Sequence, residues 1–135
     1  MEDDDLLAQF EDCTLPSECF HHADHLRVTW LYLTRHSLLE ALVKMSEGLK
    51  RYARAKDKAD RYHETITWSF VFLIRERMER SGNEHTWPRF VASNTDLFDW
   101  PNSVLKSYYR EETLKSDLAR DLFILPDNFS RLPGR

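Results

Sequence analysis

Residues 37–52 read SLLEALVKMSEGLKRY, and this stretch decides the fold class. It opens with Ser37 followed three residues later by Glu40, the capping-box pattern that begins an α-helix. Five apolar residues then recur at helical spacing: Leu38, Leu42, Met45, Leu49 and Tyr52. The stretch therefore predicts an amphipathic helix, which fades in the charged residues 56–60.

Helical patterns flank this segment on both sides. Before it, the chain breaks at Pro16, and an apolar run predicts a helix from about Glu18 to His36. After it, a third helix is expected from about residue 60 to Arg80, where Ser81-Gly82 closes it. Because the connections are short, an up-down-up arrangement follows. The starts of the first and third helices should then lie at the same end of a bundle.

The chain after Gly82 is more broken. A short helix is expected at 87–91, with proline in its first turn, and a break at 99–103. Residues 104–109 and 113–122 predict one interrupted helix or two short ones. We expect an acidic lead-in at 1–17, one domain at 18–127 and a loose tail at 128–135. The whole is predicted to be a single-domain, all-α bundle of about four to six helices.

Composition and charge bound the function. The 135 residues are 41% hydrophobic and 31% charged, which is typical of a folded globular domain. A net charge of −4 argues against nucleic acid or an anionic membrane as a partner, and the basic residues at 44–61 are interpreted as a solvated helix face. The acidic start Met1-Glu2-Asp3 is unlike a targeting peptide, so a cytoplasmic protein is expected, with Cys13 and Cys19 as free thiols.

The histidines carry the main functional hypothesis. His22 and His25 are three residues apart, so on a helix they share a face; His21 with His25 is the alternative pair. The expected topology brings His63, at the start of the third helix, to the same end. Three imidazoles with an open position suit one transition metal ion: zinc, iron, nickel or copper. We therefore predict a metal site formed by His22, His25 and His63.

Three further residues are assigned candidate roles. Glu64 is the candidate general base for metal-bound water; the alternatives are a fourth ligand, a partner of a ligating histidine, or a first-turn glutamate favoured by the helix dipole. Arg120 is a candidate for binding a substrate carboxylate or phosphate, and Trp30 for lining an apolar pocket.

Three classes of function follow from these assignments. The first is a small metal-dependent enzyme acting on a small organic substrate. The second is a non-catalytic module that binds a small organic ligand through the same end of the bundle. The third is an interaction protein that forms a homodimer, with structural histidines.

The chain also resembles a family of small bacterial proteins to which no activity is assigned. The similar runs are Phe20-x-His22-x-x-His25-Leu26, Trp30-x-Tyr32-Leu33, Tyr62-His63-Glu64-Thr65-Ile66-Thr67 and Ser116-x-x-Ala119-Arg120-x-x-Phe123-x-x-Pro126-Asp127. The resemblance implies that His22 rather than His21 pairs with His25. It implies no metal, substrate or reaction.

Overall fold

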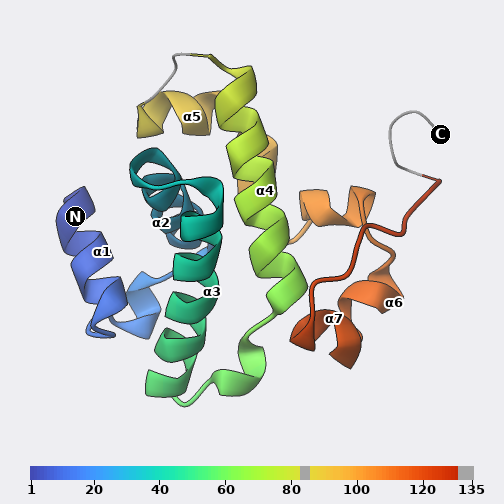
Figure 1. Ribbon diagram of the computed structural model, residues 1–135, viewed down its shortest axis with the longest axis horizontal. Coiled ribbons are helices and arrows are strands. Elements are labelled where there is room, and N and C mark those ends of the chain that lie inside the picture. Colours follow the sequence, from blue (N-terminus) through green and yellow to red (C-terminus); the bar gives the residue numbers. More distant parts are fainter. Residues whose placement is uncertain (83–85, 131–135) are drawn as a thin grey trace.

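The computed structural model describes residues 1–82 and 86–130, and within those ranges the chain is all-α (Figure 1). The single-domain, all-α prediction is confirmed, and the described residues form seven α-helices, slightly above the expected four to six. The α-helices are α1 (Asp3–Glu11), α2 (His22–Arg35), α3 (Leu38–Ala55), α4 (Glu64–Arg80), α5 (Trp87–Ser93), α6 (Glu111–Leu114) and α7 (Asp117–Asp121). Short 3-10 turns are η1 (Ser17–Cys19), η2 (Ala59–Arg61), η3 (Thr95–Phe98) and η4 (Val104–Ser107).

The helix starts have local causes. Ser37 caps α3 as predicted, accepting a bond from the backbone N–H of Glu40 at 3.2 Å. α2 begins later than expected, because Ser17–Cys19 forms a separate 3-10 turn and the Asp24 carboxylate accepts the backbone N–H of His21 at 2.9 Å. α4 also begins later, since Ala59–Arg61 is another 3-10 turn and His63 takes the N-cap position.

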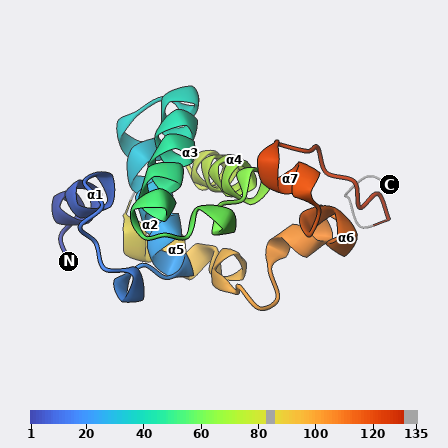
Figure 2. The same cartoon turned by 90° about the horizontal axis from the view of Figure 1, so that it is seen from below.

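The long helices α2, α3 and α4 form the centre of the fold, with α1 on one side and α7 on the other (Figures 1 and 2). The expected acidic lead-in is part of this core, because Leu6, Leu7 and Phe10 of α1 are buried. Phe10 is fully buried against α3 at Gly48, where an added Cβ would lie 2.7 Å from the Phe10 ring. The acidic N-terminal segment is therefore packed onto α3 through the buried side chain of Phe10.

The C-terminal segment is attached to α4 through both apolar and polar contacts, and Phe123 stacks on Trp68 with ring centroids 5.1 Å apart. The hydroxyl of Thr65, in the first turn of α4, donates to the Leu122 carbonyl at 2.6 Å and accepts the Ile124 N–H at 3.0 Å. The Tyr109 hydroxyl donates to the Ile124 carbonyl at 2.6 Å. These bonds hold α7 and the following residues beside the start of α4. The expected loose tail is described only as far as Ser130, and residues 131–135 lie outside the described part.

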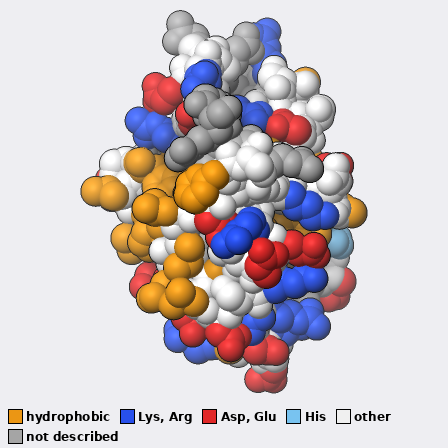
Figure 3. Space-filling model, turned by 90° about the vertical axis from the view of Figure 1, so that its right-hand side faces the viewer, with side chains coloured by type: hydrophobic (Ala, Val, Ile, Leu, Met, Phe, Trp, Pro, Cys, Tyr) orange, Lys and Arg blue, Asp and Glu red, His pale blue; other side chains and the backbone are white. Residues whose placement is uncertain are grey.

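The face formed by the C-terminal segment carries exposed apolar side chains among mixed charges (Figure 3). Leu118, Leu122, Leu125 and Phe129 are all more than half exposed. Among the described helices, none combines the length and the apolar character that crossing a bilayer requires.

Candidate functional site

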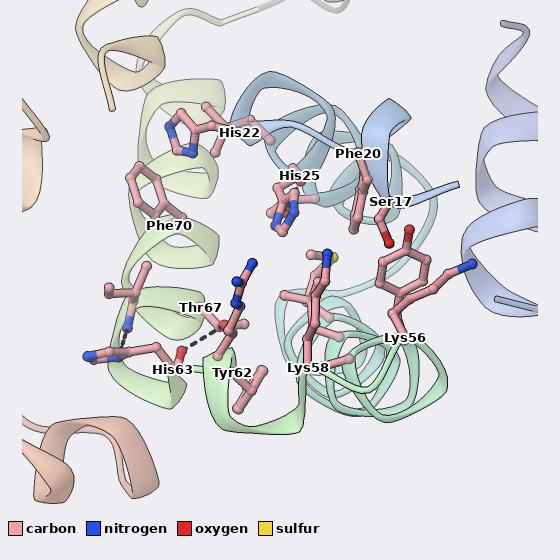
Figure 4. Close-up of a pocket in the computed structure, with 18 of the residues that line it drawn as sticks. Ser17, Phe20, His22, His25, Lys56, Lys58, Tyr62, His63, Thr67 and Phe70 are labelled. Carbon is pink, nitrogen blue, oxygen red and sulfur yellow. Dashed lines mark hydrogen bonds between the residues drawn. The ribbon is translucent and has the colours of Figure 1, made fainter. Parts of the chain in front are cut away.

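A cavity of about 450 Å³ opens between the starts of α2 and α4 and the C-terminal end of α3 (Figure 4). His22, His25 and His63 all line it, so the three predicted histidines lie at the same end of the bundle. Its remaining walls contain five aromatic rings: Phe20, Tyr52, Tyr62, Phe70 and Trp100. The cavity thus contains the three histidines that the sequence spacing selected. Its aromatic walls were not predicted from that spacing.

His22 is the first residue of α2 and bridges the cavity to the second half of the chain. Its Nε2 lies 2.8 Å from the Leu97 carbonyl oxygen, to which it donates. The ring also packs against Phe70 and Trp100, at centroid distances of 5.2 and 4.8 Å. Partial burial lowers the pKa of His22, although the bond to Leu97 acts in the opposite direction. His22 is therefore neutral at pH 7, with Nδ1 left without a proton.

His25 lies deeper in the same wall. Its ring stacks on Phe20, with centroids 3.9 Å apart and planes 19° from parallel. Burial, followed by the neighbouring His22, lowers the pKa of His25 to about 4. Its ring nitrogens make no hydrogen bond with any residue that the structure describes. The cavity therefore contains a neutral imidazole with an unused donor and an unused acceptor.

His63 uses both ring nitrogens within the protein. Nδ1 accepts the backbone N–H of Ile66 at 3.1 Å, which caps α4, and Nε2 donates to the Leu114 carbonyl at 2.7 Å. Burial lowers its pKa, and these two bonds fix the neutral tautomer with the proton on Nε2. A metal ion at His63 would have to replace one of these bonds. Within the described ranges, no three His, Cys, Asp or Glu side chains are grouped to hold a metal ion.

Glu64 is the centre of a hydrogen-bond network beside the cavity and does not itself line it. Its Oε1 accepts bonds from the Tyr62 hydroxyl, from Ser46 at 2.9 Å and from Trp68 Nε1 at 3.0 Å, and Lys50 Nζ lies 3.4 Å from Oε2. Burial raises the pKa of Glu64, but the bonds from Tyr62 and Ser46 and the Lys50 charge outweigh it and lower the pKa overall. The geometry makes Glu64 an ionised anchor that joins α3 to the start of α4.

The two candidate substrate-binding residues lie outside the cavity. Trp30 is buried on α2 and packs against Trp87, with ring centroids 5.6 Å apart. Arg120 is exposed on α7, 3.9 Å from Asp117, and its charge contributes to the lowered pKa of His63. Neither residue belongs to the lining, so the structure does not bring them together with the histidines.

Sequence reasoning missed the cations of the site. Lys56, Lys58 and Arg61, assigned above to a solvated helix face, line the cavity at the corner between α3 and α4. Lys56 lies over the Tyr52 ring, 5.4 Å from its centroid. The Lys58 and Arg61 side chains have neither an ion pair nor a hydrogen bond with any described residue. The signal available in the sequence was the three-residue spacing of Lys58 and Arg61 just before His63.

No protein-family model, curated protein or solved structure matches this chain.

Proposed function

We propose that the protein binds a small organic anion in the cavity between α2, α3 and α4. The observation that carries this proposal is the charge of the lining. Lys56, Lys58 and Arg61 line it with no ion pair to any described residue, and Lys56 lies over the Tyr52 ring. No Asp or Glu contributes to the lining among the described residues. The chain as a whole carries a net charge of −4, so a cavity lined by cations and no acid is a local departure from its average.

The ends of three helices also border the cavity. α2 and α4, of 14 and 17 residues, both begin there, at His22 and beside His63. The partial positive charge of these two N-termini is offset by the first-turn carboxylates Asp24 and Glu64 and by the C-terminal end of α3. The lining histidines are neutral, so they add hydrogen-bonding capacity without competing charge. A negative group of the ligand is therefore expected at the α3–α4 corner, beside Lys58 and Arg61.

The remaining walls suit an apolar body. Phe20, Phe70 and Trp100 present aromatic surface, and Trp100 is 46% exposed where it borders the cavity. A volume near 450 Å³ lies within the range of small-molecule sites, which combine apolar walls with a few polar groups. The arrangement therefore supports an aromatic or alicyclic anion rather than an inorganic ion.

A charge-matched ligand pair tests the proposal. 1-Naphthoate and the neutral 1-naphthamide have similar size, so a titration followed by two-dimensional NMR isolates the effect of charge. We expect the naphthoate to bind about tenfold more tightly, with the shifted amides clustered around His25 and Lys58. Lys58→Met should remove this preference, whereas the control Lys115→Met, at an exposed lysine paired with Glu111, should keep it. Equal binding of the two ligands, or shifts elsewhere, would contradict the proposal.

Metal-dependent catalysis is the second candidate, and one observation favours it: three histidines from two helices line a single cavity. His22 has Nδ1 free, His25 has both nitrogens free, and His63 would exchange its bond to Leu114 or to Ile66 for the metal. Elemental analysis of gently purified protein beside His25→Ala is the test. About one equivalent of a transition metal, lost in a still-helical variant, would favour catalysis over simple anion binding.

A further inference from the structure

We infer that the anionic group of the ligand is a phosphate monoester, held jointly by Lys58 and Arg61. This inference rests on the proposed anion-binding function and specifies its chemistry. It follows from how the chain turns between α3 and α4, and from the number of unpaired charges that the turn presents.

The corner after α3 is fully hydrogen-bonded. The N–H of Lys58 donates to the Ala53 carbonyl at 2.7 Å, and the N–H of Asp57 to the Arg54 carbonyl at 3.1 Å. These are the two bonds of a Schellman motif, with Asp57 in the left-handed conformation at φ 57°. Lys58 therefore leaves α3 from a defined backbone position.

The next turn aligns the two cations. The N–H of Arg61 donates to the Lys58 carbonyl at 2.9 Å, closing a 3-10 turn over η2. Residues three apart in a 3-10 turn lie above one another, so Lys58 and Arg61 project to the same side. Both line the cavity, whereas Asp57 and Asp60, which alternate with them, do not. The two positively charged side chains thus face the same cavity.

Charge matching then selects the group. Of the three lining cations, Lys56 lies over the Tyr52 ring, which leaves Lys58 and Arg61 for the ligand. A single carboxylate or sulfate would compensate only one of these two charges, whereas a phosphate monoester carries close to two negative charges above pH 7. Its three terminal oxygens match a bidentate guanidinium together with a point-charge ammonium.

The organic part of the ester would extend from the α3–α4 corner into the cavity. Figure 4 shows Lys58 extending from the corner toward His25 and Phe20, with His22 and Phe70 on the far wall. The esterified alcohol would lie along these rings, where the unused nitrogens of His25 meet any polar substituent. The expected ligand is therefore the phosphate monoester of an aromatic or apolar alcohol.

1-Naphthyl phosphate and 1-naphthyl sulfate test this assignment, since they share shape and differ by one charge at pH 8. Calorimetric titration at constant ionic strength should give at least about tenfold tighter binding of the phosphate, the scale of one charge-assisted contact. Arg61→Leu and Lys58→Met should each reduce the phosphate-over-sulfate ratio toward one. Arg80→Leu, an exposed arginine paired with Glu76 at the far end of α4, should leave the ratio unchanged.

The outcomes separate the two levels of the proposal. Comparable binding of phosphate and sulfate, both lost in Lys58→Met, would overturn the monoester assignment and leave an anion site. Inorganic phosphate binding as tightly as the naphthyl ester would also overturn it, because the aromatic walls would then contribute nothing. If neither naphthyl ester binds and 1-naphthoate does not bind either, the anion site itself is rejected. Circular dichroism of each variant ensures that a change in the ratio of phosphate to sulfate affinity is interpreted only for folded protein.

Discussion

The two halves of the molecule are held together differently. Residues 3–80 form four helices whose apolar faces bury one another, including Leu31, Met45 and Ile74, each at most 2% exposed. Residues 86–130 form short helices that add Phe90, Leu97 and Leu105 to the same core, and side-chain bonds such as those of Thr65 also attach them to the start of α4. The cavity lies where the halves meet, and His22 and His63 both donate across the boundary. The site is thus built on the long N-terminal helices and completed by the C-terminal half.

A matched pair of leucines gives the strongest test of this comparison. Leu31→Ala removes a side chain that is 2% exposed on α2, and we expect a loss of about 3 kcal/mol in the free energy of unfolding. Leu118→Ala, at a residue of α7 that is 58% exposed, should change it by less than about 0.5 kcal/mol. Urea denaturation measures both. A large loss for Leu118→Ala would indicate that its face is covered in solution, as in a homodimer.

Acid should weaken the two halves in separate pH ranges. The folded-state pKa of His25 is about 4, below its ordinary value of 6.5, so the unfolded chain takes up the proton first and stability falls as pH drops from 6.5 toward 4. The expected loss between pH 7 and pH 4.5 is about 2 kcal/mol. Denaturation at both pH values measures it, and His25→Phe should remove most of it. An unchanged loss in that variant would assign the effect to other groups, of which His22 and His63 titrate in the same direction.

The C-terminal half should respond at lower pH. Partial burial raises the pKa of Asp127, but bonds from the Thr113 hydroxyl and the Arg110 N–H outweigh it and lower the pKa below 3.8. Its stabilising contribution is therefore present above that value and lost only as pH falls through the lowered pKa. Hydrogen exchange around Tyr109 and Ile124 should separate this second step from that of His25.

Removing one hydroxyl should loosen the boundary between the halves. Thr65→Val keeps the shape of a fully buried side chain but leaves the Leu122 carbonyl and the Ile124 N–H unpaired, at an expected cost of about 1.5 kcal/mol. Faster amide exchange at Ile124, with α2 and α3 unaffected, would confirm local release. Thr65→Ser retains the hydroxyl and is the control. Equal protection in Thr65→Val and wild type would contradict a polar attachment.

A smaller expected loss tests how firmly α1 packs against α3. Gly48→Ala improves helix propensity, yet the new methyl group would lie 2.7 Å from the buried ring of Phe10. The strain should exceed the gain, for a net loss of about 1 kcal/mol by urea denaturation. Adding Phe10→Leu should recover part of this loss. If Gly48→Ala stabilises the protein, α1 can shift away from α3 at little cost and the Phe10 contact is not rigid.

The sequence predicted the long N-terminal helices better than the C-terminal half. The capping box at Ser37 and the apolar face of α3 are local signals, and both appear in the structure as predicted. The up-down-up topology, which follows from the same local signals and the short connections, placed His22, His25 and His63 at one cavity. By contrast, the packing of α1 depends on the contact between Phe10 and Gly48, which are 38 positions apart, and no periodicity encodes it.

The electrostatics of the site were not predictable from residue spacing alone. A run of Lys and Arg alternating with Asp is typical of a solvated face, and only the 3-10 geometry of η2 separates Lys58 and Arg61 from Asp57 and Asp60. Nor does a histidine at a helix start reveal that both its nitrogens are engaged. His63 finds its second partner at Leu114, 51 residues later, in the half that spacing describes least.

The close approach of Phe10 to Gly48 also has an evolutionary consequence. A ring and a backbone in direct contact constrain each other, so among descendants of a common ancestor these two positions should change together. Lineages that gain a side chain at position 48 should carry a smaller residue at position 10. This paired signature joins the acidic start of the chain to its central helix and gives a criterion for recognising distant relatives whose cavity residues have diverged.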